Sequence, residues 1–337
     1  MLGRWTRRAI VAALEATQDS LDAAVALLCD DKQSKARSSH WAGMRPTPAT
    51  QVVGYLDPEY PALLKVIPDP PLVLELFGNT ALLGRASVSV VGARRCTLAG
   101  AEIAQKFAQE MGRAGVVITS GLAIGVDGAA HRGALTSSTG TIACLGSGIE
   151  QIYPKSHARL AEQICAADGL IISEYAATVL PRPYHFPERN RLISGLSNGV
   201  LLVEAGEKSG SLITARLALE QGRDVFVVPG PINSPVSRGC HRLIRQGAEL
   251  VTESSQILES LGIEAVANAV SPPLPTNSLS GDQAYLVKLV SGFAIRFDQL
   301  VELTGWSEDR LMMELARLEL TGIVRRASDG YIATSLA

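Results

Sequence analysis

The 337-residue chain lacks several features that mark specialised classes of protein. Its five cysteines show no CxxC spacing, and neither a signal peptide nor an apolar run of twenty residues occurs. These absences predict a reduced, cytoplasmic compartment and no membrane partner. With 47% hydrophobic and 19% charged residues, the chain can bury a large core, and we expect more than one domain.

An excess of positive charge is also missing. The formal net charge is −2, and no polybasic tail is present. A polyanion such as nucleic acid would therefore have to be attracted by a local cluster of cations, because the field of the whole molecule does not favour it.

Apolar runs typical of strands recur through the middle of the chain, with helical patterns between them. They are residues 87–91 (SVSVV), 115–119 (GVVIT), 141–145 (TIACL), 170–173 (LIIS), 200–203 (VLLV) and 224–228 (DVFVV). Continuous apolar strands joined by helices predict an α/β fold with a Rossmann-like, doubly wound parallel sheet. Because open parallel sheets bind ligands at the carboxyl edge of their strands, we expect the functional site at that edge.

The flanks differ from this central region in composition. Residues 1–45 are predicted to form a small helical (SAM or helix-hairpin-helix type) module, and 46–265 the Rossmann-like domain with an N-terminal proline-punctuated connector. Residues 266–280 have the Pro, Ser and Asn content of a linker. Three helical patterns and a strand pair in residues 281–337 then give the order of a winged helix.

The predicted winged helix is more acidic than a domain that binds duplex DNA. It has eight acids against six bases, and its candidate recognition helix, residues 307–320, is net acidic. Such a helix would be repelled by phosphates on approaching a groove, so we expect it to contact protein.

Two predicted helix starts in residues 182–216 favour anions. Pro187 suits the first position of a helix, which places residues 188–191 (ERNR) in the first turn, where backbone N–H groups lack internal partners. After the predicted strand 199–205, the turn 206–211 (GEKSGS) opens a second helix with its backbone donors facing outward. Two helix starts that attract anions therefore flank one strand.

Two further cations follow strands of the predicted sheet. Arg94 lies in the turn after residues 87–91, and Lys155 precedes the helix predicted at 156–167. Each alone reads equally well as an ordinary exposed cation. Together at one edge of the sheet they favour contact with phosphate. Gly121 is predicted to let the backbone approach closely, either to a ligand or to a neighbouring stretch of chain.

Several familiar catalytic spacings are missing. The turn after residue 91 has no GxGxxG, Lys208 precedes the glycine that it would follow in a Walker A motif, and no GxSxG occurs. Asp127 and His131 lie four residues apart on one helix face, but a metal would need a third ligand, and a local hydrogen bond is the commoner outcome. We therefore predict no catalytic residue, no metal and no cofactor.

Seven motifs stand in order along the chain: VGARR, SGLAIGVDGAAHRGAL, GSGIEQIYPKSH, ISEY, HFPERNRLISGLS, VLLVEAGEKSGSLITARLALEQGRDVFVVPG and GCHRLIRQGAELV. This series, over about residues 50–255, resembles the DprA (Smf) family of bacterial DNA-processing proteins. The resemblance implies a non-enzymatic protein that binds single-stranded DNA and forms a homodimer through its Rossmann-like domain. It also implies protection of incoming DNA and loading of the recombinase RecA during natural transformation.

The resemblance also assigns site residues. With the loop glycine included, the DNA-binding residues are Arg94, Gly121, Lys155, Arg189, Asn190, Arg191, Ser209, Gly210 and Ser211. A dimer and RecA surface is implied at about residues 238–251, with His241, Leu243, Ile244 and Gln246. Contact between these apolar side chains and the core of the same chain is the alternative. Tyr184, His185 or Phe186 could offer ring faces to DNA bases.

Three other functions compete with this one. Related Rossmann-like phosphoribohydrolases carry PGGxGTxxE, but here the corresponding stretch is EAGEKSGSLIT, with Thr214 where the glutamate would fall. The missing GxGxxG disfavours a dinucleotide-dependent oxidoreductase. A protein-interaction scaffold, in which the cationic edge is incidental, is the third alternative.

Overall fold

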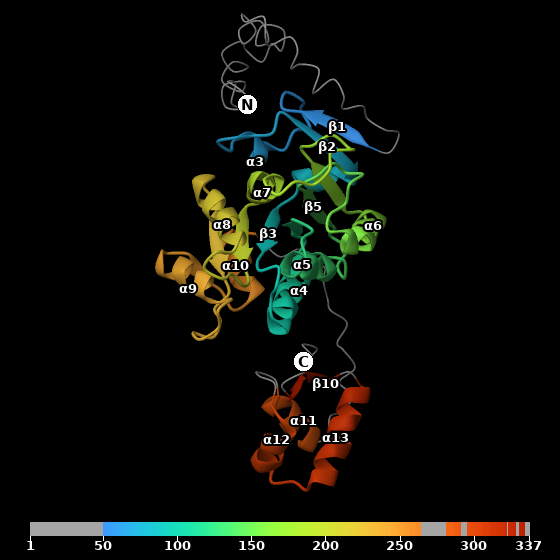
Figure 1. The fold of residues 1–337 in the computed structure, drawn as a ribbon, viewed down its shortest axis with the longest axis vertical. Helices are drawn as coiled ribbons and strands as arrows, with labels where there is room; N and C mark the ends of the chain where they lie inside the picture. The colour runs from blue at the N-terminus through green and yellow to red at the C-terminus, as the bar shows by residue number, and fades with distance from the viewer. Residues whose placement is uncertain (1–49, 264–280, 291–294, 322, 328–329, 334–337) are drawn as a thin grey trace, which may run out of the picture. The chain divides into compact units, whose positions relative to one another are not determined.

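The computed structural model describes residues 50–263, 281–290, 295–321, 323–327 and 330–333. The chain divides into two compact units, Met1–Ala269 and Val270–Ala337, drawn in Figure 1. The predicted helical module at 1–45 and the predicted linker at 266–280 lie outside the described residues.

A nine-stranded sheet forms the centre of the described part of the first unit, in the order β1-β2-β6-β5-β4-β3-β7-β8-β9. It begins with β1 (Gln51–Gly54) and β2 (Val73–Gly78). Strands β3 to β9 are mutually parallel. Their bounds are Ser87–Val91, Val117–Ser120, Thr141–Leu145, Leu170–Ser173, Gly199–Leu202, Asp224–Val227 and Glu249–Leu250. The order runs outward from β3 in both directions, which confirms the predicted doubly wound parallel sheet.

Helices cover both faces of this sheet because successive strand residues point to opposite sides. One apolar core packs beneath α3 (Ala62–Lys65), α7 (His185–Gly195), α8 (Ser211–Glu220) and α9 (Arg238–Arg245). Two further clusters lie beneath α4 (Leu98–Arg113), α5 (Val126–Ala134), α6 (Ala158–Ala166) and α10 (Ser254–Ser260). The helices therefore form two layers around the sheet, as Figure 1 shows.

The proline-punctuated connector contributes two strands that the sequence pattern did not predict. β1 (Gln51–Gly54) pairs with β2 (Val73–Gly78), and β2 pairs with β6, both in antiparallel register. The 3-10 helix η2 (Thr80–Gly84) then leads into β3. The connector is thus part of the sheet and carries it beyond β6.

Gly133 lets α5 pack directly against α4. A Cβ at this position would overlap the backbone carbonyl of Gln105. A backbone atom cannot relieve the overlap by changing rotamer, as a side chain could. We therefore expect Gly133→Ala to lower the free energy of unfolding by about 1–3 kcal/mol in denaturant titration. Gly84→Ala, where nothing lies within 4 Å of the added Cβ, is the matched control. A change below about 0.5 kcal/mol, the scale of ordinary surface substitutions, would contradict the expectation for Gly133.

The second unit has its own apolar core. Helices α11 (Gly281–Leu289), α12 (Phe297–Thr304) and α13 (Glu308–Leu320) precede the antiparallel pair β10 (Val324–Ala327) and β11 (Gly330–Ala333). Buried side chains from each helix form the core, among them Leu286, Leu300, Leu311, Leu315 and Leu318. This order confirms the predicted winged helix. In neither unit does any helix that the structure describes have the length and apolar character needed to span a membrane.

Candidate nucleic-acid interface

Two loops and the first turn of α7 meet at the carboxyl edge of the sheet, around the ring of Phe186. The guanidinium carbon of Arg94, in the loop after β3, lies 5.3 Å from the Phe186 ring centroid. The ring of Tyr153, in the loop after β5, lies 5.4 Å from the same ring. Arg94 and Tyr153 are exposed, whereas Phe186 is half-buried. The structure thus brings a cation and two aromatic rings together from segments far apart in sequence.

Lys155 reaches the same edge from a short 3-10 helix, η3 (Lys155–His157). The His157 ring nitrogen Nδ1 lies 2.9 Å from the carbonyl oxygen of Leu122, which ties η3 to the loop after β4. Lys155 is exposed and lies two residues beyond Tyr153. Arg94 and Lys155 are therefore both exposed, which the predicted contact with phosphate and the alternative of an ordinary surface cation equally require.

The sequence predicted Arg189 as an open cation in the first turn of a helix, and the structure contradicts this. Its side chain is buried, with 3% exposed. The Nη1 atom donates to the carbonyl oxygen of Gly121 at 2.7 Å and to that of Cys144. Burial lowers the pKa of Arg189, and the carboxylate of Asp127 opposes that shift. Arg189 holds the ends of β4 and β5 together from inside the protein.

The contact between Arg189 and the loop after β4 also explains why residue 121 is glycine. A Cβ on this residue would collide with the Arg189 guanidinium and with a carboxylate oxygen of Asp127. The backbone N–H of Gly121 donates to Asp127 Oδ2 at 3.2 Å. The close approach that the sequence predicted is therefore to other residues of the same chain. Gly121 is itself buried.

Arg191 is likewise internal, contrary to the expectation of a free cation. Its Nη2 lies 2.7 Å from Glu174 Oε1 and its Nε lies 3.0 Å from Asp69 Oδ2. Burial opposes the charge, but Glu174 and Asp69 outweigh it and raise the pKa of Arg191. Because Glu174 follows β6 and Asp69 belongs to the connector, Arg191 links three segments beneath the site.

Helix α7 begins at His185, two residues earlier than predicted. Pro187 fits its third position because the first backbone N–H groups of a helix have no internal acceptor. The side chain of Asn190, in the middle of α7, donates to the carbonyl oxygen of Gly210, at the start of α8, in a long hydrogen bond of 3.5 Å. The hydroxyls of Ser209 and Ser211 are 2.7 Å apart. The two predicted helix starts are therefore neighbours.

The aromatic residues divide into a buried and an exposed set. His185 is buried, stacks on Tyr175 with ring centroids 4.1 Å apart, and places Nδ1 3.2 Å from the Gly146 carbonyl oxygen. Its burial lowers its pKa, and its ring is not open to a base. Tyr184 and Tyr153 are 52% and 44% exposed. Tyr153 was missed in the sequence, although it directly precedes the Pro-Lys segment at this edge.

Asp127 and His131 do not form the predicted local hydrogen bond. His131 Nδ1 lies 2.9 Å from Thr141 Oγ1, whereas Asp127 faces Gly121 and Arg189. Burial lowers the pKa of His131 to about 3, which keeps its ring neutral. Within the described ranges no three His, Cys, Asp or Glu side chains are arranged to hold a metal ion.

The start of α4 is occupied by a carboxylate from the chain itself. Glu204, which follows β7, accepts hydrogen bonds from Thr97 N at 2.8 Å and Thr97 Oγ1 at 2.6 Å. Gly100 packs against this carboxylate. In dinucleotide-binding folds a pyrophosphate sits at the helix start after the first strand. Here Glu204 occupies the corresponding place and accepts from the N-cap residue Thr97, which the sequence pattern did not reveal.

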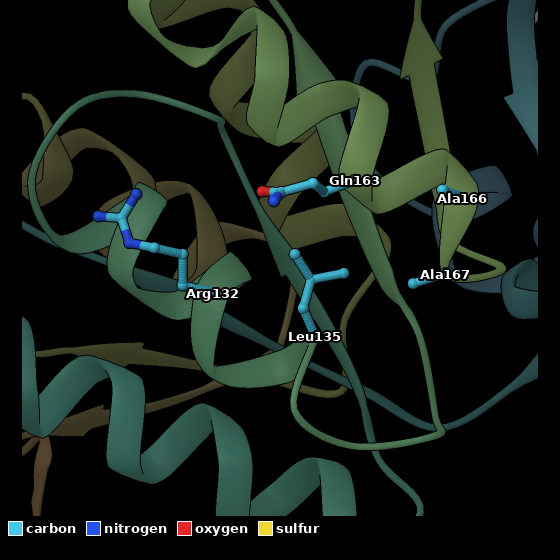
Figure 2. A pocket seen from close by; sticks show the side chains of 5 residues that line it. All are labelled: Arg132, Leu135, Gln163, Ala166 and Ala167. Atoms are coloured by element: carbon cyan, nitrogen blue, oxygen red, sulfur yellow. The ribbon is translucent and has the colours of Figure 1, made fainter.

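An open pocket of about 460 Å³ lies away from these loops. Figure 2 shows the side chains that line it, which are Arg132, Leu135, Gln163, Ala166 and Ala167. They belong to the last turns of α5 and α6 and the residues that follow, and both helices start at the carboxyl edge and run away from it. This pocket is therefore separate from the cluster around Phe186.

The predicted dimer and RecA surface on α9 is partly internal. Leu243 is 7% exposed and packs in the core with Ile244 against it, so these two side chains follow the intramolecular alternative. His241 Nε2 lies 2.9 Å from the Gly230 carbonyl oxygen. Gln246 is exposed, and so is Leu250 on the edge strand β9. The outward surface of this region is thus largely polar.

Comparison with known proteins places the chain among related sequences. The family model of DNA recombination-mediator protein A matches residues 51–262, and that of the DprA winged helix domain matches 270–330. Protein Smf of Escherichia coli K12 is 42% identical over 283 residues, covering 81% of this chain and 74% of that protein. DprA of Streptococcus pneumoniae is 46% identical over 203 residues, covering 60% and 71%.

Solved structures agree with this assignment. The X-ray structure of DprA from S. pneumoniae has a TM-score of 0.67 at 37% identity and covers 75% of this chain and 93% of that one. A structure of Helicobacter pylori DprA, concerned with its single-stranded DNA binding mode, has a TM-score of 0.57 at 32% identity and covers 63% and 95%. Since one family model matches more than half of its length, the chain belongs to the DNA recombination-mediator protein A (DprA/Smf) family.

Proposed function

We propose that this chain binds single-stranded DNA at the carboxyl edge of its sheet, and that it acts in DNA processing during natural transformation. The observation that carries the proposal is the convergence of Arg94, Tyr153 and Phe186, with Lys155 two residues from Tyr153. Cations beside aromatic rings are the usual means of binding a single strand. The relatives named DNA processing protein, and the single-strand binding described for the H. pylori protein, support it.

The exposed groups have separate tasks in this proposal. Arg94 and Lys155 neutralise backbone phosphates, while the open faces of Tyr153 and Tyr184 stack with bases. Because every base has a stacking face, such a surface accepts strands of any sequence. The turn at residues 209–211 adds a hydroxyl donor beside α7, because only one of the paired Ser209 and Ser211 hydroxyls donates to the other. Arg189 and Arg191 act from within by holding the loops that carry these groups.

Contact with RecA, contact with a second copy of the chain, and protection of the bound strand belong to the same proposal. A protein that holds a strand along one edge of its sheet leaves other surfaces for RecA and for a second copy of the chain. We place those contacts on the outward side of α9 and β9, where Gln246 and Leu250 are exposed. On this view the bound strand is protected and then transferred to the recombinase.

The internal partners of the site favour binding over nucleotide hydrolysis. Thr214, which stands where the phosphoribohydrolase motif has its glutamate, is 2% exposed and carries no acid. Glu204 occupies the helix start where a small nucleotide's phosphate would bind. Both features leave a longer polyanion, held at the loop cations, as the ligand that fits best.

A salt series with fluorescent oligonucleotides tests this proposal. We expect the full chain to bind a thymidine oligomer more tightly than a duplex of equal length. Arg94→Ala and Lys155→Ala should each weaken binding to any single strand, and each should reduce the salt slope by about 0.7 per lost phosphate contact. Fluorescence anisotropy at several salt concentrations gives both quantities.

Arg113→Ala is the matched control, because Arg113 is exposed at the opposite end of α4. It should leave the affinity and the slope unchanged. Equal slopes for the original chain and both site variants would refute the assignment of these cations to phosphate.

A further inference from the structure

The outer side of α13 carries apolar side chains that the winged helix does not bury. Met312, Met313 and Leu320 are 58%, 49% and 89% exposed, and Ala316 between them is exposed as well. Spacings of three and four residues place 313, 316 and 320 on one helix face, with Met312 at its border. We call these four residues the α13 outer face. The opposite side of the helix fills the domain core.

Acidic residues accompany this face. Glu308, Asp309 and Glu319 are exposed on α13, and they belong to none of the ion pairs found among the described residues. Asp309 lies one turn before Met313, and Glu319 lies between Ala316 and Leu320 in sequence. The α13 outer face is thus an apolar strip with negative charge beside it.

The cations of α13, which the structure describes in full, are already paired. Arg310 Nη2 lies 2.5 Å from Asp282 Oδ2, and its guanidinium also covers the ring of Trp306 at 4.5 Å. Arg317 Nη1 lies 2.9 Å from Glu314 Oε1. A helix that enters a DNA groove needs cations available for phosphates. In α13 those cations serve the domain's own carboxylates.

Methionine pairs and nearby carboxylates have a specific binding chemistry. Methionine is flexible and polarisable, so it adapts to apolar partners of different shape. Surfaces of this kind receive amphipathic helices through their apolar side, and the charge beside the apolar strip selects the sign of the partner. Negative charge here selects a positive partner.

We propose that the α13 outer face docks a basic amphipathic helix of a partner protein. The apolar residues of that helix cover Met312, Met313 and Leu320, and its lysines or arginines lie over Glu308, Asp309 and Glu319. This role is independent of the strand-binding edge, so each can fail without the other.

The full chain can be tested with a labelled 18-residue peptide that has leucine at helical i, i+3, i+4 and i+7 spacing and lysine elsewhere. We expect saturable binding in fluorescence anisotropy. The Met313→Ser/Leu320→Ser variant should weaken it at least tenfold. The Glu308→Gln/Glu319→Gln variant should weaken it and also make it less sensitive to salt. A peptide with glutamate in place of lysine should not bind.

The control variant is Leu219→Ser/Ile232→Ser, which removes two exposed apolar residues of the first unit and should bind the lysine peptide normally. Equal weakening in this control would overturn the proposal, and so would equal binding of the glutamate peptide. A duplex oligonucleotide whose binding is lost in Met313→Ser/Leu320→Ser would overturn it in favour of DNA recognition by α13.

Discussion

Replacing Arg191 with methionine is expected to lower the free energy of unfolding by about 3–5 kcal/mol, the usual cost of removing one partner of a buried ion pair. The loss arises because the carboxylates of Glu174 and Asp69 lose the guanidinium that they share. The Glu174 side chain is 3% exposed, so its charge would lose the Arg191 guanidinium at a place where water cannot replace it. Asp69 is 45% exposed and can regain water. Chemical denaturation followed by circular dichroism measures the change.

Two further variants identify the cause of that loss. Glu174→Gln in the Arg191→Met background removes the stranded charge and should recover at least half of the lost stability. Arg216→Met breaks a pair with Glu220 whose side chains are 77% and 49% exposed, and it should cost no more than about 0.5 kcal/mol. A loss below about 1 kcal/mol for Arg191→Met would show that the buried pair contributes no more than a surface pair.

The second large effect is expected at Arg189. Arg189→Leu removes the donor to the Gly121 and Cys144 carbonyl oxygens and leaves Asp127 buried without its cation. We expect a stability loss of about 3–5 kcal/mol at pH 7. Single-strand affinity should also fall at temperatures where the variant is folded, because the loop ends that carry the site would no longer be tied together.

The pH dependence distinguishes this explanation from a simple packing defect. Burial raises the pKa of Asp127, and the Arg189 charge is the main influence that lowers it. Without Arg189 that pKa rises further. The pKa of Asp127 is about 3.9 in the unfolded state and higher in the folded state. At a pH between these two pKa values the folded state binds more protons than the unfolded state, so the free energy of unfolding falls as pH rises.

The loss in free energy of unfolding that Arg189→Leu causes, relative to the original chain, should therefore be smaller at pH 4 than at pH 7. Asp127→Asn in the same background should remove this pH dependence, since no proton is then exchanged at residue 127. Unfolding free energies at both pH values decide the matter. A deficit of equal size at pH 4 and pH 7 would contradict the electrostatic explanation.

Much of the sheet could be predicted because its strands are buried on both faces. The runs 141–145 and 170–173 coincide with β5 and β6. Such strands are continuously apolar, and the pattern is visible within a few residues. β1 and β2 were missed because they lie among prolines, and β9 because Glu249–Leu250 is only two residues long and exposed. β1 and β9 are also the edge strands of the sheet, and edge strands have weaker local signals than central ones.

The buried arginines show the limit of local patterns. An arginine in the first turn of a helix is normally exposed, so its side chain was expected to face the ligand. The partners that bury Arg191 are 17 and 122 residues away in sequence, and no spacing in the chain points to them. The cluster of Arg94, Tyr153 and Phe186 likewise depends on contacts between two loops and a helix that are distant in sequence. Arg94 and Lys155, by contrast, follow strand ends, where exposure is the usual outcome.

If the protein binds single-stranded DNA as proposed, the carboxylate of Glu204 at the start of α4 decides how well free nucleotides compete with the strand. A free nucleotide carries a phosphate that a vacant helix start would attract. Glu204 is part of the chain and never dissociates, so this position is closed to them. A single nucleotide then has only one or two loop contacts available, whereas a strand makes several at once and gains from their combined effective concentration. The protein would thus discriminate by polymer length, with no need to recognise a base.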